Sequence, residues 1–490
     1  MKKILVAATA ALALATPALA FDVKWSGDFN HRFTYSTQAD LAVNTVLSGE
    51  GNGFINVSDA AFANSLNTEK KKNDSDFFGD LKYRLTLTAT DDDKKVKGVL
   101  GFEFGGRKFG QVGGLDFGGD DNIFEFRWGY VDFEVPFDTS SRLSVGLMPV
   151  GYNKFLWSDN AAGVKWASKR GNLGYSLAWF RDDVNNVGGG GAVKLQNDDA
   201  YAFDITYTVP QGPKLNAFAI YLEEGQESIV FTPAAGDFIV NPTTGAIVRA
   251  TPAVNTSFMD QQLWVGLAGE GQVGALFYGF TGIYLTGEAD ARGLQLFANP
   301  SATIPEHGTL DRKAYLLNAE ATYKFAKMRI KGGWLYSTGD DDPNDDELNN
   351  FANIDAYMGG FGSVVIFDGI ADDNTANSAP FIRDRGLNMP YLSVDYDMTD
   401  KASVGASYLY VAAAEDIKTA QGLKGEKFLG HEVTARASYK VTKNLTTAIE
   451  AGYLIGGDAW DNLATSTTPL DVKDEADNVF RTNVGIRYMF

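Results

Sequence analysis

The chain has 490 residues, no cysteine and a formal net charge of -19 at pH 7. The lack of cysteine excludes disulfides, thiolate-bound iron–sulfur clusters and covalently attached c-type haem, and the acidic balance argues against nucleic acid or anionic lipid as partners. After residue 20, no apolar run approaches the ~18 residues that a membrane-spanning helix needs, so we expect no helical membrane protein.

The first 20 residues have the pattern of a secretory signal peptide. Lys2 and Lys3 precede the apolar run Ile4-Ala15, and Ala18 and Ala20 are small residues where a signal peptidase cleaves. We therefore expect residues 1–20 to be removed on export and residues 21–490 to form one domain.

The next segment, Phe21-Ser36, alternates apolar and polar side chains. Val23, Trp25 and Phe29 fall on one side of an extended chain, because successive strand residues point to opposite faces. About eighteen such segments follow one another, with sixteen as a possible number. They span residues 21–36, 81–90, 96–104, 123–135, 142–148, 161–168, 173–180, 201–209, 214–222, 262–268, 273–285, 313–325, 327–337, 391–398, 402–411, 432–441, 445–455 and 479–490.

Two details of this pattern go beyond the count of strands. In 123–135 the apolar side switches after Tyr130, which predicts a bulge or a buried end. The connections alternate between short turns and long loops, the longest being 37–77, 224–260 and 338–387. Within the second, residues 237–251 read as two β-rich arms around a turn, which predicts a hairpin.

The last segment, Val479-Phe490, ends in Tyr488 and Phe490, and its pairing with the first segment would close a barrel. These two aromatics resemble the terminal signature of bacterial outer-membrane proteins, which implies that the barrel-assembly machinery reads them. The chain resembles an outer-membrane porin. The resemblance implies an all-β, transmembrane, antiparallel up-and-down barrel in the outer membrane of a Gram-negative-type bacterium, with short periplasmic turns and long external loops.

In such a barrel the apolar faces contact lipid and the polar faces line water. An Arg or Lys at mid-depth on the lipid side costs ~2–4 kcal/mol, so we expect charged strand residues to face the lumen. The predicted pore-lining cations are Arg32, Arg84, Arg127, Lys165, Arg329, Lys331, Arg436, Arg481 and Arg487, and the anions are Asp28, Glu103, Glu320, Asp395 and Glu450, with Glu125, Asp204 and Glu432 on the same faces. Alternatively, many of these residues pair across strands and stiffen the wall.

The connection 149–160 follows the fifth segment. In trimeric general porins the loop at this position folds inward and forms the constriction. By this resemblance Lys154 and Asp159 are candidate constriction charges, and Tyr152, Phe155 and Trp157 would anchor the loop.

The segment 336–350 is similar to the Ser-Gly-Asp-rich loop of alginate-export-type barrels. Asp340, Asp342 and Asn344 provide oxygen atoms at alternate positions and are candidate Ca²⁺ ligands, although the spacing departs from an EF-hand. A solvated acidic loop is the alternative to a metal site.

The chain offers little for catalysis. Its three histidines, His31, His307 and His431, form no Ser-His-acid pattern, so we expect no enzyme and no cofactor. The resemblance implies a channel for passive diffusion of small hydrophilic solutes and ions. The alternatives are a substrate-selective polysaccharide or anion channel, or a structural barrel that sheathes a partner. The resemblance to porins also implies a homotrimer, in which the small outward residues Ala402, Ala406, Ala435 and Ala437 would provide a flat contact between barrels.

Overall fold

The computed structural model describes residues 21–37, 75–109, 124–184, 197–231, 238–240, 247–249, 254–290, 309–342, 345–367, 385–418, 425–459 and 478–490. The predicted signal peptide and His307 lie outside these residues. No helix in the described part of the chain is long and apolar enough to cross a membrane.

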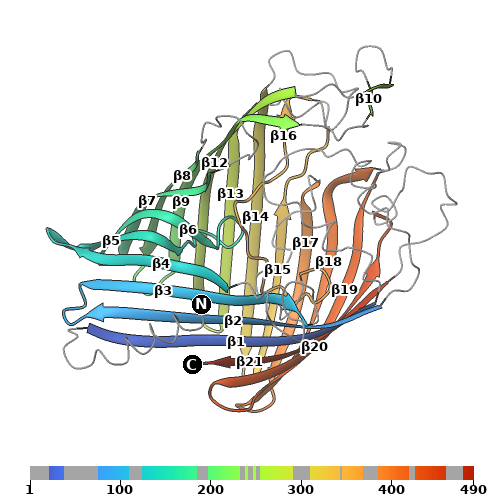
Figure 1. Cartoon of the computed structure of the whole chain (residues 1–490). Coiled ribbons are helices and arrows are strands. Elements are labelled where there is room, and N and C mark those ends of the chain that lie inside the picture. Colours follow the sequence, from blue (N-terminus) through green and yellow to red (C-terminus); the bar gives the residue numbers. More distant parts are fainter. Residues whose placement is uncertain are drawn as a thin grey trace.

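The described strands form a closed, antiparallel barrel of 18 strands (Figure 1), which confirms the predicted fold class. Each strand pairs with its neighbours in chain order, and β1 also pairs with β21 to complete the circle. The barrel strands are β1 (Phe21–Thr37), β2 (Ser75–Asp91), β3 (Val96–Lys108), β4 (Phe124–Val135), β5 (Asp138–Pro149), β6 (Asn160–Arg170), β7 (Leu173–Val184), β8 (Asn197–Thr208), β9 (Lys214–Phe231), β12 (Val254–Val273), β13 (Leu276–Asp290), β14 (Thr309–Phe325), β15 (Met328–Ser337), β17 (Leu387–Asp397), β18 (Ala402–Lys418), β19 (Gly425–Lys440), β20 (Leu445–Gly456) and β21 (Val479–Met489).

Short turns join alternate strand pairs and therefore lie on one rim, together with the start of β1 and the end of β21. Several turns contain residues in the left-handed region, including Lys94 (φ 58°), Gln211 (φ 56°) and Ala326 (φ 49°). This conformation lets the chain reverse within a few residues. The strand ends that flank the long connections lie on the opposite rim, as the sequence predicts.

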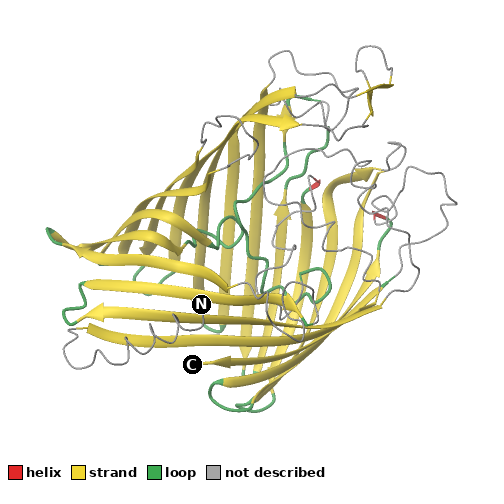
Figure 2. Cartoon of the chain, viewed as in Figure 1, coloured by secondary structure: helices red, strands yellow, loops and turns green. Residues whose placement is uncertain are grey.

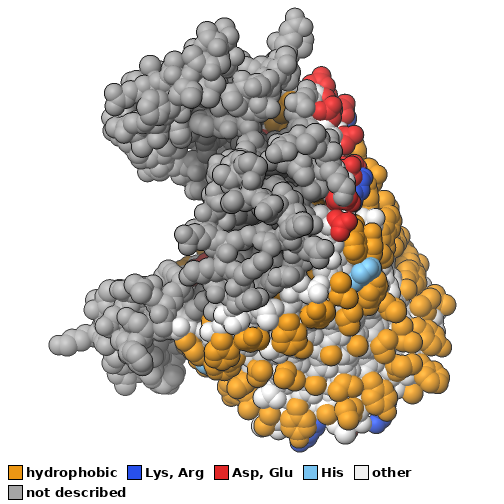
Figure 3. Space-filling view, turned by 90° about the vertical axis from the view of Figure 1, so that its right-hand side faces the viewer, with side chains coloured by type: hydrophobic (Ala, Val, Ile, Leu, Met, Phe, Trp, Pro, Cys, Tyr) orange, Lys and Arg blue, Asp and Glu red, His pale blue; other side chains and the backbone are white. Residues whose placement is uncertain are grey.

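The outer surface of the barrel is apolar. Leu267 on β12 is 53% exposed and Ile449 on β20 is 51% exposed, whereas Trp264, on the other face of β12, is fully buried. Figure 3 shows this outer surface as a broad hydrophobic area, with Asp and Glu side chains gathered toward one end. Large apolar side chains therefore point away from the lumen, which is the opposite of a soluble β-barrel.

Several details of the strands agree with the sequence or extend it. The ladder between β3 and β4 shifts register where Phe102 pairs with Phe126 and Gly101 with Trp128. The strand therefore has a bulge, but at Arg127 rather than after Tyr130, where the sequence places the switch of face. The predicted hairpin in the loop after β9 is also confirmed, as β10 (Phe238–Val240) pairs with β11 (Ile247–Arg249). Several strands are longer than predicted, because their backbone ladders continue toward the long loops, where polar side chains no longer mark an outward face.

The barrel closes at a tight contact between Gly27 on β1 and the last residue of the chain. Phe490 and Gly27 exchange two backbone hydrogen bonds of 2.9 and 3.0 Å. The Phe490 ring lies directly over Gly27, where an added Cβ would meet ring atoms at 2.5 Å. The ring also makes an edge contact with Phe29 at a centroid distance of 5.6 Å. A side chain at position 27 would therefore displace the terminal aromatic ring from the first strand.

We expect Gly27→Val to lower the stability of the folded barrel by ~1–3 kcal/mol, as overpacking does in tight contacts. The fraction of protein that migrates as a compact, heat-modifiable band on a gel measures this loss. Gly98→Val on β3 is the matched control, since an added Cβ there meets nothing within 4 Å. Equal folded fractions for the two variants would show that the seat at Gly27 is unimportant.

Candidate functional site: a lumenal insert and the cavity beside it

The connection between β5 and β6, residues 150–159, turns inward. It reverses on itself through a hydrogen bond from the Tyr152 amide to the Trp157 carbonyl (3.2 Å), and the Asn153 side chain accepts from the Phe155 amide at 3.0 Å. Phe155, Leu156 and Trp157 are at most 4% exposed. Since a surface turn would leave such side chains in water, their burial shows that the connection packs against other parts of the protein.

A second inward segment, residues 351–367, covers the first. It belongs to the connection between β15 and β17, whose start contains the two-residue strand β16 (Glu347–Leu348). The Ile354 and Asp355 amides donate to the Leu156 carbonyl, both at 3.0 Å, and the Tyr357 amide donates to the Lys154 carbonyl at 2.6 Å. We call residues 150–159 and 351–367 together the lumenal insert; Figure 2 shows both as loops inside the barrel.

The sequence did not reveal the second half of the insert. The sequence predicts an inward fold only for 149–160, and it predicts an external loop for 338–387. The available signal was composition: after an acidic start, this connection contains Phe351, Phe361 and Ile366 with no lipid-facing strand to carry them. All three are at most 1% exposed. Apolar residues in a long loop indicate that the loop packs on something.

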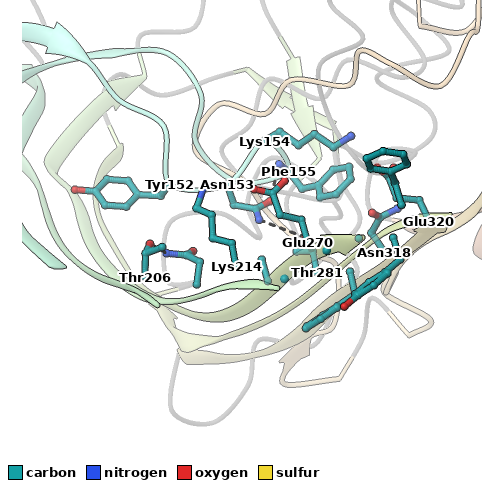
Figure 4. Close-up of a pocket in the computed structure, with 18 of the residues that line it drawn as sticks. Tyr152, Asn153, Lys154, Phe155, Thr206, Lys214, Glu270, Thr281, Asn318 and Glu320 are labelled. Carbon is teal, nitrogen blue, oxygen red and sulfur yellow. Dashed lines mark hydrogen bonds and ion pairs between the residues drawn. The ribbon is translucent and has the colours of Figure 1, made fainter. Parts of the chain in front are cut away.

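A cavity of about 860 Å³ lies beside the insert, toward the short-turn rim (Figure 4). Its volume is within the ~300–1,000 Å³ range of small-molecule sites. Its polar lining includes hydroxyl and amide side chains such as Thr206, Asn216, Thr281 and Asn318, beside aromatic rings such as Phe155 and Phe280. Its charged lining residues are Lys154, Lys165, Lys214, Asp204, Glu270 and Glu320.

Lys154 is the insert's cation at this cavity. Its Nζ lies 4.7 Å from the centre of the Phe155 ring and 4.8 Å from that of Phe361. Burial lowers the pKa of Lys154 from its usual value; nearby Glu320 opposes this shift and Lys331 adds to it. No described carboxylate forms an ion pair with this amine. Asp159, the other predicted constriction charge, is exposed, does not line the cavity and accepts from the Asn160 amide group at 2.9 Å.

Glu320 belongs to a small network beside Lys154. Its Oε2 lies 3.0 Å from Lys331 Nζ and accepts a 2.9 Å hydrogen bond from the Tyr391 hydroxyl. Glu320 and Tyr391 are on β14 and β17, separated by β15, and they meet above Gly333, where a side chain would collide with Tyr391. Because Gly333 on β15 has no side chain, Glu320 on β14 and Tyr391 on β17 can contact each other across it.

Most other predicted pore-lining residues form ion pairs across strands. Glu103 forms ion pairs with Arg84 (2.7 Å), Arg127 (3.1 Å) and Lys82 (3.2 Å). Lys82 lies on the same face as Arg84 but is not among the residues predicted from the sequence. The further pairs are Arg32–Asp80, Arg329–Asp397, Arg436–Asp395 and Arg487–Asp28. The other predicted residues have different surroundings. Lys165 lies over the Tyr152 ring, with its Nζ 5.2 Å from the ring centre. Glu450 accepts a 2.9 Å hydrogen bond from Asn483, Asp204 accepts one from Ser176, and Glu125 is exposed.

The remaining candidate residues are placed as follows. Among the described residues, no group of three or more His, Cys, Asp or Glu could hold a metal ion. Asn344, one of the three candidate Ca²⁺ ligands, lies outside the described residues, and the backbone carbonyl of Asp340 accepts from Arg385. His31 and His431 contact the hydroxyls of Tyr83 (2.8 Å) and Tyr408 (2.7 Å) on neighbouring strands.

The sequence matches no protein-family model, and no curated protein matches it. The fold, however, is similar to solved structures from Pseudomonas aeruginosa. OccK8 (OprE) has a TM-score of 0.53 with 12% identity, covering 96% of this chain and 98% of that chain. OccK9 (OpdG) has a TM-score of 0.52, 12% identity and the same coverage. The outer membrane protein opdK has a TM-score of 0.50 with 11% identity, covering 95% and 98%. The chain therefore has the fold of bacterial outer-membrane porins.

Proposed function

We propose that this protein is a channel of the bacterial outer membrane through which small hydrophilic solutes and ions diffuse passively. One observation carries the proposal: a cavity lined by charged side chains of both signs lies inside a barrel whose outer wall is apolar. A barrel of this kind is stable with lipid outside and water inside. We propose no catalytic role.

The geometry supports a channel with a size limit and weak charge preference. The lumenal insert occupies part of the lumen and leaves the cavity between itself and β6, β8, β9, β12, β13 and β14. Three cations and three anions line this cavity, so neither sign of charge prevails along it. Rings of mixed charge select ions weakly, whereas the width of the passage limits solute size.

Recordings from single proteins in planar lipid bilayers test the proposal. The purified protein should produce stepwise increases in current with weak ion selectivity, and vesicles that contain it should swell in small sugars but not in large ones. The absence of any current and of any swelling would exclude an open pore.

An anion-selective channel is the second candidate. It is favoured by Lys154 and Lys165, which both line the cavity and form no ion pair with described residues. Reversal potentials in a salt gradient distinguish the two candidates, since a strong preference for anions would favour selective uptake over general diffusion. A barrel that merely sheathes a partner predicts a blocked or unusually wide lumen.

We expect Lys154→Glu to shift the reversal potential toward cation selectivity, because the change replaces a cavity cation with an anion beside Glu320. Lys401→Glu, on the exposed turn 398–401, makes the same charge change away from the cavity and should shift it much less. Since burial lowers the pKa of Lys154, its contribution should disappear at a lower pH than that of an exposed lysine. Equal shifts of the reversal potential in the two variants would show that Lys154 does not lie on the path of the ions.

We also propose that the barrel is a homotrimer. Four small residues lie at one level across adjacent strands on the outer face: Ala406, Ala435, Ala451 and Thr482. This band leaves a flat area where another barrel can approach. The mass of the protein in detergent, measured by light scattering, should be three times that of the chain. Removal of residues 1–20 and recognition of Tyr488 and Phe490 by the barrel-assembly machinery remain predictions.

A further inference from the structure

The segment 351–367 is held against the wall by hydrogen bonds at several points. The Trp264 indole donates to the Ala352 carbonyl at 2.9 Å. At the other end of the segment, the hydroxyls of Ser407 and Thr434 donate to the Gly362 carbonyl at 2.7 and 2.8 Å. The segment is therefore fixed to β12, β18 and β19 at two separate places.

The carboxylate of Glu432 makes the most extensive of these attachments. Its Oε1 accepts from the Val364 amide at 2.5 Å and from the Val365 amide at 2.8 Å. Its Oε2 accepts from the Ile366 amide at 3.2 Å and from the Ser363 hydroxyl at 2.7 Å. Successive amides that converge on one anion form a strong binding site, because each donor is already oriented toward the charge. Glu432 itself is fully buried.

An opposite charge holds the same turn from β21. Arg481 Nη1 donates to the Val365 carbonyl at 3.2 Å and to the Val364 carbonyl at 3.5 Å. The amides and carbonyls of one short turn are thus bound by a carboxylate and a guanidinium from two different strands. Both residues are predicted to line the pore, and in the structure each of them binds the insert.

We infer that Glu432 is a positioning residue that sets the size limit of the channel. This inference rests on the proposed function. Glu432 holds residues 363–366, these fix the Phe361 ring beside Phe155 (6.3 Å between centroids), and this aromatic pair flanks Lys154 at the cavity. When the turn is released from the wall, the second half of the insert moves away and the passage widens.

Glu432→Gln tests the inference with little change in shape. An amide offers one acceptor oxygen, and its NH₂ group faces two of the donors that the carboxylate bound. We expect a higher mean conductance, more switching between current levels, and swelling of vesicles in sugars that the native channel excludes. Amide hydrogen exchange at residues 364–366 should become faster by on the order of tenfold. Glu432→Asp, which keeps the charge, should recover part of each property.

Asp132→Asn is the matched control. Asp132 is a buried carboxylate on β4 that pairs with Arg142 and does not contact the insert. It should leave conductance, sugar limit and exchange at 364–366 unchanged. If Glu432→Gln fails to fold, the pair Ser407→Ala and Thr434→Val removes the bonds to Gly362 and should widen the passage to a smaller extent.

The outcomes separate this inference from the proposed function. A native protein without conductance contradicts the channel itself. A conducting native protein with the same conductance and sugar limit in Glu432→Gln contradicts only the role of Glu432. Faster exchange at 364–366 without any change in the passage also overturns the inference, since Glu432 would then hold a segment that does not limit the pore.

Discussion

A chain in which residues 351–367 are replaced by a short Gly-Ser linker should conduct ions several times better than the intact protein. These residues form half of the lumenal insert and cover the other half, so their removal opens the lumen above the cavity. Pore conductance rises with the cross-section of the narrowest part. The deletion lies in a connection between strands, and the barrel ladders do not include it. Single-channel recordings measure the effect directly.

Removal of residues 238–249 is the control for this deletion. That stretch contains the hairpin of β10 and β11, which pairs only with itself among the described strands. It should leave the conductance unchanged. If both deletions give the native conductance, the insert does not narrow the pore; if both raise it, the effect comes from shortening loops in general.

The largest loss of stability is expected from Asp260→Asn. Asp260 on β12 and Arg312 on β14 form an ion pair with N···O distances of 2.7 and 2.9 Å, and both side chains are fully buried. Gln262 adds a 2.8 Å hydrogen bond to the same carboxylate. Removal of one charge from a fully buried ion pair costs ~3–5 kcal/mol. Urea unfolding in lipid vesicles, followed by tryptophan fluorescence, measures this free energy.

Two comparisons test the cause of that loss. Asp22→Asn removes a carboxylate from the exposed pair with Lys24, whose side chains are 64% and 77% exposed, and should cost less than ~1 kcal/mol. Replacing both Asp260 and Arg312 with leucine should recover much of the stability, because no unpaired charge remains. A double variant as unstable as Asp260→Asn would show that packing, rather than the charge, decides the outcome.

The alternation of side chains predicted most of the strands, because nearly all of them repeat a two-residue period with one apolar face. The face switch expected after Tyr130 indicated a bulge in this strand, but the bulge lies earlier, at Arg127. Alternation alone does not show whether the apolar faces point outward or inward. The outward direction was inferred from the loop pattern and from the terminal Phe490. Strand ends were less accurate, as β2 begins at Ser75 rather than residue 81, since ladders beyond the apolar belt depend on backbone bonds.

The candidate site was harder to predict, because its parts meet only through the closed barrel. Residues 351–367 have no regular period, and nothing local to them indicates that Glu432 and Arg481 will bind their backbone. The partners of the lumenal charges depend on register between strands. Lys331 and Glu320 pair because β14 and β15 align Gly333 with Glu320, and a shift of one residue would send these side chains to lipid.

The two halves of the insert are joined largely by backbone hydrogen bonds, as at Leu156, which accepts from Ile354 and Asp355. Hydrogen bonds between backbone groups do not depend on which side chain a residue carries. A substitution of a side chain such as Lys154 can therefore change which solutes pass, while the backbone structure of the insert stays the same.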